Sequence, residues 1–324
     1  MSIRLSICVP TYNRVIYLQE CLDSIIASME RYETQIEILI SDNASADGTA
    51  DLVNKYQKHN PKIRYHRNET NIGAERNLYQ LAKMCQGEFL WLFGDDDKMT
   101  KEAVAEVLHR IESGYNLIIC NYSIWSKDFL VQNTARNLIK KDKDFIHHND
   151  LMGTFGLHVG YLSSVIIKRP LFFKLPFSEY EAFCEYGFPF AYSVYTGIMG
   201  ECCATYIAAP VVCNRSANSG NYDWCKYFIV GGALIFETLL LKSYSKQAVS
   251  SAKSGVIKDY IVPYIVTSRS KGIHNRKEII RAMFPHYKSN GLFWMLCLPL
   301  CVIPVFLARP LKSILMMIRR MKSK

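Results

Sequence analysis

Glycine-rich phosphate-binding motifs are missing from this 324-residue sequence. It contains no GxxxxGKS/T, which excludes a P-loop kinase or ATPase. It has no GxGxxG after its first apolar segment, which argues against a dinucleotide-dependent oxidoreductase. No glycine- and basic-rich loop follows that segment either, which argues against a sugar nucleotidyltransferase. What remains is a metal–diphosphate site, in which carboxylates approach the phosphates through a cation.

Paired cysteines and a secretory leader are also missing. The eleven cysteines include no CxxC pair, and the apolar residues 3–9 are too few for a signal peptide and lack a cleavage pattern. We therefore expect reduced thiols and a cytoplasmic location. Acids are scarce near the other end, where residues 271–324 contain only Glu278. The net charge of +10 favours anionic partners such as nucleotides, anionic lipid or nucleic acid, without choosing between them.

Apolar strands and amphipathic helices alternate over the first 120 residues. Hydrophobic residues make up 49% of the chain, which is typical of a globular protein with one large or two ordinary domains. The alternation predicts βαβ units and a mostly parallel sheet. Thr100 is the expected N-cap of the last helix. We expect strands at residues 5–9, 36–40, 63–66, 89–93 and 117–120, and helices at residues 18–29, 47–56, 74–84 and 103–111.

Three polar clusters follow the expected strands. They occupy residues 10–14, 41–43 and 95–97. Ligands bind at the carboxyl ends of strands in such sheets, so we expect the clusters to converge on one edge. The third cluster is three consecutive aspartates after an apolar strand. A divalent cation with oxygen ligands would offset their repulsion and desolvation, and the alternative is a solvated acidic turn.

Several short motifs, in order, resemble those of a known enzyme family. They are VPTYNR at residues 9–14, SDNASADGT at 41–49, NIG at 71–73 with Arg76 and Asn77, and the aspartate-rich strand end. Together they cover about the first 120 residues and resemble family 2 glycosyltransferases with the GT-A fold. FGDDD at residues 93–97 and YLSSVIIK at 161–168 look most like abequosyltransferase-type enzymes of O-antigen synthesis.

The resemblance implies a fold and an activity. The fold is α/β, a Rossmann-like GT-A sheet flanked by helices, and the enzyme is a hexosyltransferase-type glycosyltransferase. It would move a sugar from a nucleotide-sugar donor to a growing glycan, such as a polyprenyl-diphosphate-linked oligosaccharide of O-antigen or capsule synthesis. The reaction would be metal-dependent and inverting, with no nucleic acid as partner. A sugar nucleotidyltransferase and a catalytically inactive, membrane-associated scaffold are the alternatives.

The resemblance also assigns a donor site. Asp42 matches the acid that accepts hydrogen bonds from the base, which suits the N–H of a pyrimidine in UDP-, CDP- or dTDP-type donors. Arg76 matches a basic residue near the diphosphate, and Arg215 lies in a late loop that closes over it. The alternatives are an Asx turn for Asp42 and a solvated helix charge for Arg76. The candidate donor-binding residues are Pro10, Thr11, Tyr12, Arg14, Asp42, Asn71, Arg76, Asp95 and Arg215.

The expected metal site departs from the family in one position. The usual motif is DxDD, and here Gly94 replaces its first aspartate. The family's ribose contact is therefore missing, and Asp95 is the candidate to replace it. Asp96 is expected to bind the metal directly, with Asp97 as its neighbour. Mn²⁺ or Mg²⁺ suits this all-oxygen ligation and offsets charge on the departing nucleoside diphosphate.

An inverting transfer also needs a base for the proton of the acceptor hydroxyl. In the family this is an acid, often in a Glu-Asp pair before a helix. Glu185 occupies the corresponding place, although Tyr186 replaces the aspartate, and Pro189 fits the first turn of the helix. Glu185 is the first candidate, followed by Glu181 and Glu179. The alternative is that all three are ordinary surface carboxylates.

The C-terminal third predicts contact with a membrane. Residues 291–308 are almost wholly apolar and reach about the lower length limit of a membrane span, but Pro299 and Pro304 interrupt them. Residues 311–324 have the pattern of a basic amphipathic helix. We expect re-entrant or interfacial docking, with the protein peripheral at the inner face of the cell membrane. The alternative is a buried C-terminal helix pair with a solvated basic tail.

We therefore expect three consecutive parts. Residues 1–120 form the nucleotide-sugar-binding half, 121–220 the acceptor-binding half with the base, and 221–324 the helical C-terminal region with its apolar hairpin and basic tail. His158 lies in the second part. We interpret it as a structural hydrogen-bonding residue, and the alternative is a contact with the acceptor.

Overall fold

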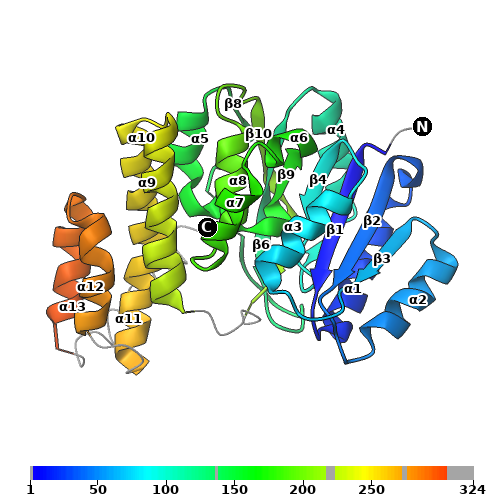
Figure 1. The fold of residues 1–324 in the computed structure, drawn as a ribbon, viewed down its shortest axis with the longest axis horizontal. Coiled ribbons are helices and arrows are strands. Elements are labelled where there is room, and N and C mark those ends of the chain that lie inside the picture. Colours follow the sequence, from blue (N-terminus) through cyan, green and yellow to red (C-terminus); the bar gives the residue numbers. More distant parts are fainter. Residues whose placement is uncertain (1–2, 136–137, 217–222, 272–275, 305–324) are drawn as a thin grey trace. The chain divides into compact units, whose positions relative to one another are not determined.

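The computed structural model describes residues 3–135, 138–216, 223–271 and 276–304. The chain forms two compact units, whose elements are labelled in Figure 1. The three-part functional division stays a prediction. The first unit consists of Met1–Ile146, Tyr161–Phe177 and Thr196–Ser219, and the second of His147–Gly160, Ser178–Tyr195 and Gly220–Lys324.

The strand–helix alternation of the first 120 residues is confirmed. The three strands β1, β2 and β4 are almost wholly buried, as expected for central strands of a parallel sheet. The helix α4 begins after Glu102 and not after Thr100, because one further turn precedes it, in which the Thr100 carbonyl accepts a hydrogen bond from Ala103. The elements are β1 (Leu5–Thr11), α1 (Val15–Met29), η1 (Glu33–Gln35), β2 (Ile36–Asp42), α2 (Thr49–His59), β3 (Ile63–Arg67), α3 (Ala74–Met84), β4 (Phe89–Leu92), β5 (Lys98–Met99), α4 (Ala103–Glu112) and β6 (Leu117–Trp125).

The sheet is mixed, which corrects the expectation of a mostly parallel one. Its order is β3-β2-β1-β4-β9-β6-β10-β5, and the first four strands are parallel. The strand β9 (Val165–Lys168) lies antiparallel between β4 and β6. Its VIIK sequence has the composition of any buried strand, so the sequence pattern does not reveal its direction. The remaining elements of this unit are β7 (Gln132–Ala135), β8 (Lys143–Phe145), η3 (Leu162–Ser164), α6 (Arg169–Phe172) and β10 (Ala204–Arg215).

The second unit is helical. Its residues 225–242 form η4 and α9. The helices α5 and α10 pack closely, since a Cβ at Gly153 would lie 3.6 Å from the Ser251 Cβ. The elements are α5 (His148–Phe155), η2 (Gly156–Gly160), α7 (Phe177–Cys184), α8 (Pro189–Gly197), η4 (Cys225–Gly231), α9 (Gly232–Lys242), α10 (Lys246–Val256), η5 (Ile257–Ile261), α11 (Val262–Lys271), α12 (Arg276–Tyr287), η6 (Phe293–Cys297) and α13 (Leu298–Val302). The first residue of α7 and the last two of α8 are assigned to the first unit.

The apolar C-terminal run is described as far as residue 304. It forms the short helical segments η6 and α13. Its last four residues and the expected basic amphipathic helix over residues 311–324 lie outside the described residues. Across the ranges that are described, no helix combines the length and the apolar character needed to cross a bilayer.

Candidate functional site

The polar clusters after the strands converge at one edge of the sheet, as expected. Figure 1 shows β1 between β2 and β4, and their carboxyl ends carry the clusters. The Thr11 hydroxyl donates a hydrogen bond to Asp95 Oδ2 at 2.8 Å. The backbone N–H of Asn43 donates to the Thr11 carbonyl at 2.9 Å. Loops that are distant in sequence therefore form one polar site.

Asp95 is buried at the centre of this site. Its Oδ1 accepts a hydrogen bond from Arg14 Nη1 at 3.1 Å, and the same nitrogen lies 3.3 Å from Asp96 Oδ2. Burial raises the pKa of Asp95 to about 6, against the opposing effect of the Arg14 guanidinium. Arg14 therefore bridges two adjacent carboxylates and reduces their mutual repulsion.

Asp97 is the most heavily hydrogen-bonded of the three aspartates. Its Oδ2 accepts hydrogen bonds from the hydroxyls of Tyr161 and Ser163, both at 2.6 Å. Its Oδ1 accepts from Asn214 Nδ2 at 3.1 Å and from the backbone N–H of Arg215 at 3.2 Å. Burial, reinforced by the Asp96 charge, raises the pKa of Asp97 to about 7. These contacts anchor the turn, and metal ligation by Asp97 stays a prediction.

Asp96 has the most exposed side chain of the three, at 20%. No group of three or more His, Cys, Asp or Glu side chains in the described ranges is arranged to hold a metal ion. Mg²⁺-type sites commonly use one or two carboxylates together with substrate phosphates and water. The accessible, all-oxygen side chain of Asp96, next to Asp95, fits such a site.

Gly94 has a packing role at this turn. A Cβ at this position would lie 3.1 Å from Asp96 Oδ1, 3.2 Å from Asp97 Oδ2 and 3.3 Å from Ser163 Oγ. The Gly94 N–H also donates to Ser163 Oγ at 2.9 Å. The departure from the family motif therefore makes room for aspartates that fold back over the glycine.

Restoring the family carboxylate with Gly94→Asp is expected to destabilise the protein by about 3 kcal/mol, because a fourth acid enters a crowded acidic turn. The midpoint of thermal unfolding should fall by roughly 6–12 °C. The control Gly94→Ala adds only the methyl group and should cost about 1 kcal/mol. Thermal unfolding followed by circular dichroism checks both values, and a Gly94→Asp variant as stable as the wild type would contradict the packing role.

Arg215 is buried at the end of β10, behind the aspartate turn. Its Nε donates to the Asp96 carbonyl at 3.0 Å, and its Nη2 pairs with Glu20 at 2.5 Å. The guanidinium lies between the rings of Tyr17 and Phe129, 4.7 and 4.3 Å from their centres. These contacts position Asp96, and closure of Arg215 over a diphosphate stays a prediction. The partners Tyr17, Glu20 and Phe129 were not expected from the sequence.

Asp42 is fully buried at the end of β2. Its Oδ1 accepts a hydrogen bond at 2.8 Å from the N–H of Ser45, three residues later, which is one residue further along than the bond that defines an Asx turn. Its Oδ2 accepts from the Tyr65 hydroxyl at 2.7 Å and lies 3.5 Å from Arg67 Nε. A contact between Asp42 and a nucleotide base stays a prediction.

Asparagines join the loops around the expected donor site. Asn43 Nδ2 donates to Asn71 Oδ1 at 2.7 Å, and that oxygen also accepts from the Gly73 N–H at 2.9 Å. Asn68 Nδ2 donates to the side-chain oxygens of Asn43 and Asn77 at 3.0 and 2.9 Å. Asn71 therefore organises the start of α3. Asn43 and Asn77 lie within the motifs that carry the family resemblance, whereas Asn68 had no sequence signal.

The remaining donor-site candidates differ in exposure. Tyr12 is 44% exposed in the loop after β1, and Arg76 is exposed in the first turn of α3. Pro10 is partly buried in β1. Tyr12 and Arg76 are therefore accessible to a ligand, and all three assignments stay predictions.

The candidate base residues belong to the second unit. Glu185, whose side chain is 68% exposed, accepts a hydrogen bond from Lys226 Nζ at 3.0 Å. Glu179 accepts from Lys242 Nζ at 2.6 Å and from the Tyr192 hydroxyl at 2.7 Å, and these hydrogen bonds lower its pKa. Glu181 is exposed on α7. Their catalytic roles stay predictions.

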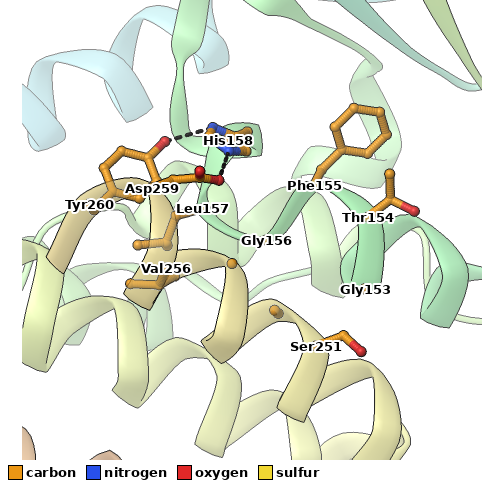
Figure 2. A pocket seen from close by; sticks show the side chains of 12 residues that line it. Gly153, Thr154, Phe155, Gly156, Leu157, His158, Ser251, Val256, Asp259 and Tyr260 are labelled. Atoms are coloured by element: carbon orange, nitrogen blue, oxygen red, sulfur yellow. Dashed lines mark hydrogen bonds and ion pairs between the residues drawn. The ribbon is translucent and has the colours of Figure 1, made fainter. Parts of the chain in front are cut away.

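His158 is held within the second unit by two side chains. Figure 2 shows it between Asp259, whose Oδ2 lies 3.0 Å from Nε2, and Tyr260, whose hydroxyl lies 2.7 Å from Nδ1. Both ring nitrogens are engaged in the protein. This geometry agrees with the interpretation of His158 as a structural hydrogen-bonding residue.

Comparison with known proteins identifies relatives of this chain. The family model Glycosyl transferase family 2 matches residues 6–174. Abequosyltransferase RfbV of Salmonella typhimurium is 31% identical over 66% of this chain and 67% of its own length. GalNAc(5)-diNAcBac-PP-undecaprenol beta-1,3-glucosyltransferase of Campylobacter jejuni is 28% identical over 47% of this chain. The match covers about half, 48%, of the length of that protein.

Two solved structures share the fold. Staphylococcus aureus TarS 1–349 in complex with UDP-GlcNAc superposes with a TM-score of 0.63 at 16% identity, covering 86% of this chain and 79% of that chain. The mannosyltransferase PcManGT of Pyrobaculum calidifontis, in complex with GDP-Man and Mn²⁺, superposes with a TM-score of 0.54 at 13% identity. The superposition covers 97% of this chain and 88% of that chain. The expected GT-A-like α/β architecture is therefore confirmed, with a mixed sheet.

Proposed function

The chain belongs to glycosyltransferase family 2, and from that premise we propose that this glycosyltransferase moves a sugar from a nucleotide-sugar donor to a growing, lipid-linked glycan. The observation that carries the proposal is the convergence of Thr11, Arg14, Asp95 and Asp96 at the carboxyl edge of the sheet. O-antigen synthesis is the favoured context, because the relative RfbV is an abequosyltransferase.

The donor would bind at this edge through accessible groups. Tyr12 and Arg76 are exposed there, and Arg76 lies in the first turn of α3, where a helix N-terminus favours phosphate. Asp42 and the asparagine network would hold the loops that surround the nucleotide. Structures related in fold are named for complexes with UDP-GlcNAc and GDP-Man, which supports a nucleotide-sugar as the donor.

A divalent cation, Mn²⁺ or Mg²⁺, is part of the proposal. Asp96 would hold it, with Asp95 beside it, while Asp97 and Arg215 fix the turn from behind. Mn²⁺ in the related PcManGT complex supports this cofactor. When bound, such a cation offsets the negative charge that develops on the departing nucleoside diphosphate.

The transfer itself would invert the anomeric carbon. The acceptor oxygen forms a bond to that carbon while the bond to the diphosphate oxygen breaks. The acceptor hydroxyl gives its proton to a carboxylate, for which Glu185 is the first candidate and Glu181 the second. The undecaprenol-linked substrate in the name of the Campylobacter jejuni relative supports a lipid-linked acceptor and a peripheral location at the inner membrane face.

A donor screen tests the proposed function. Among UDP-, CDP- and dTDP-sugars, the true donor is expected to raise the unfolding midpoint by roughly 5–10 °C at a concentration of about 100 times its Kd, and only with Mn²⁺ or Mg²⁺ present. Slow hydrolysis should release nucleoside diphosphate. Pyrophosphate release from a nucleoside triphosphate and a sugar phosphate would instead identify a nucleotidyltransferase. Failure to bind or hydrolyse any nucleotide-sugar would identify an inactive scaffold.

A further inference from the structure

Exposed apolar side chains are concentrated at the end of the described chain. Ring contacts bring the aromatic ones together, since the ring centres of Phe284 and Trp294 are 6.3 Å apart and those of Phe293 and Trp294 are 5.1 Å apart. Contiguous apolar surface of this kind marks contact with a membrane or a protein. The exposed large hydrophobic residues of this stretch are Phe284, Trp294, Met295, Leu296 and Val302, which we call the apolar face.

The segment that carries this face is one-sided. Phe293, Cys297 and Cys301 are buried in the second unit, while Trp294 and Met295 are 49% and 67% exposed. Figure 1 shows α13 beside α12, and the two helices are in contact. The segment therefore lies along the surface of the unit, with its other side turned outward.

Hydrogen bonds hold the face in place. Trp294 Nε1 donates to the Lys288 carbonyl at 2.8 Å, which fixes the indole on the turn after α12. The Arg269 guanidinium donates to the carbonyls of Leu300 and Ile303 at the end of α13. A fixed apolar face loses little conformational entropy when it binds.

Basic residues border the face. Lys277, Arg281 and Lys288 are exposed, and their positions share helical spacing with Phe284 along one side of α12 and just past its end. Lys288 Nζ lies 5.7 Å from the centre of the Phe284 ring. Residues 305–324, outside the described part, contain no acid. Their sequence includes the cations Arg309, Lys312, Arg319, Arg320, Lys322 and Lys324.

We propose that the apolar face docks on the headgroup region of an anionic bilayer, with the basic side of α12 against the lipid phosphates. Tryptophan is suited to this depth, because its ring is apolar and its N–H polar. Apolar burial and cationic attraction act together in such interfacial binding. Only the purpose of docking rests on the proposed function: docking would bring the enzyme to a lipid-linked acceptor.

Sedimentation of the full chain with vesicles tests the proposal. Wild type should bind phosphatidylcholine vesicles containing phosphatidylglycerol more tightly than vesicles of phosphatidylcholine alone. Trp294→Ser/Met295→Ser should weaken partitioning about tenfold or more, whereas Leu241→Ser, an exposed leucine on α9, should not. Arg281→Glu/Lys288→Glu should weaken partitioning more than tenfold, because each lost cation costs about fivefold. The control Lys258→Glu should have a much smaller effect on partitioning.

Fluorescence separates the face from the basic tail. The signal of Trp294, taken as the difference between wild type and Trp294→Phe, should be quenched by brominated lipid. Vesicle binding without that quenching would assign the contact to the tail alone and overturn the proposal. A wild-type dimer that Trp294→Ser/Met295→Ser converts to monomer, without vesicle binding, would overturn it in favour of a second copy.

Donor hydrolysis in vesicle-free solution keeps this inference distinct from the proposed function. Trp294→Ser/Met295→Ser should retain wild-type hydrolysis of the nucleotide-sugar found in the screen, which also reports that it is folded. Vesicle binding by a protein that hydrolyses no nucleotide-sugar would leave the docking face standing and overturn the enzymatic proposal. Hydrolysis by a wild type that binds no vesicles would support the enzymatic proposal and overturn the docking face.

Discussion

Replacing Asp96 with alanine is expected to lower kcat/KM for sugar transfer by about 10²–10⁴-fold, because a bound cation contributes several kcal/mol of charge stabilisation in the transition state. Asp96 carries the most accessible carboxylate of the turn, with 20% of its side chain exposed. The variant should also lose the Mn²⁺-dependent part of donor binding. Thermal shifts with the nucleotide-sugar, measured with and without Mn²⁺, check this loss, and full activity would contradict the assignment.

Asp97→Asn is the matched control for Asp96→Ala. The asparagine Oδ1 can still accept from Asn214 and Arg215, while the hydroxyls of Tyr161 and Ser163 can reverse and accept from its amide. Since burial raises the pKa of Asp97 to about 7, a neutral side chain is also electrostatically tolerable there. Activity within about tenfold of wild type is expected. A folded Asp97→Asn variant as inactive as Asp96→Ala would make Asp97 a second metal ligand.

Local sequence patterns were sufficient for the edge of the sheet that carries this site. Apolar segments gave the strands, and the polar residues after them gave the loops, so the convergence that brings Thr11 next to Asp95 followed from the assumption of parallel strands. The neighbour of β4 was wrong, because β9, which comes from a later segment, lies antiparallel between β4 and β6, while β6 itself keeps the expected direction. Periodicity reports burial, and it carries no information on which neighbour a strand finds.

Partners from distant segments were the part that the sequence did not reveal. Tyr161 and Ser163, which bind Asp97, lie within a segment noticed only through its family resemblance. Arg215 was expected in a loop over the diphosphate, which stays a prediction, but its contact with Glu20, 195 residues earlier in the chain, was not expected. Helical spacing on α1 identifies only its buried apolar side. The sequence therefore does not indicate which residue a charged side chain on that helix, such as Glu20, will contact.

Glu185→Gln is expected to leave donor binding unchanged and to lower kcat by about 10²–10⁴-fold, the usual contribution of a general base. Glutamine keeps the size of the side chain and cannot take the proton of the acceptor hydroxyl. Glu179 is a weaker candidate, because hydrogen bonds from Lys242 and Tyr192 lower its pKa and so its basicity. Steady-state kinetics with saturating donor, alongside donor thermal shifts, separate the two effects.

The other acids on and after α7 serve as controls for this assignment. Glu179→Gln should lose the pairing with Lys242 and Tyr192, so we expect a lower unfolding midpoint with kcat near that of wild type. Glu181→Gln should leave both quantities close to wild type if Glu185 is the base. Loss of kcat in Glu181→Gln, with Glu185→Gln fully active, would transfer the catalytic role to Glu181. Unchanged kcat in all three variants, Glu179→Gln, Glu181→Gln and Glu185→Gln, would place the base outside α7 and the residue that follows it.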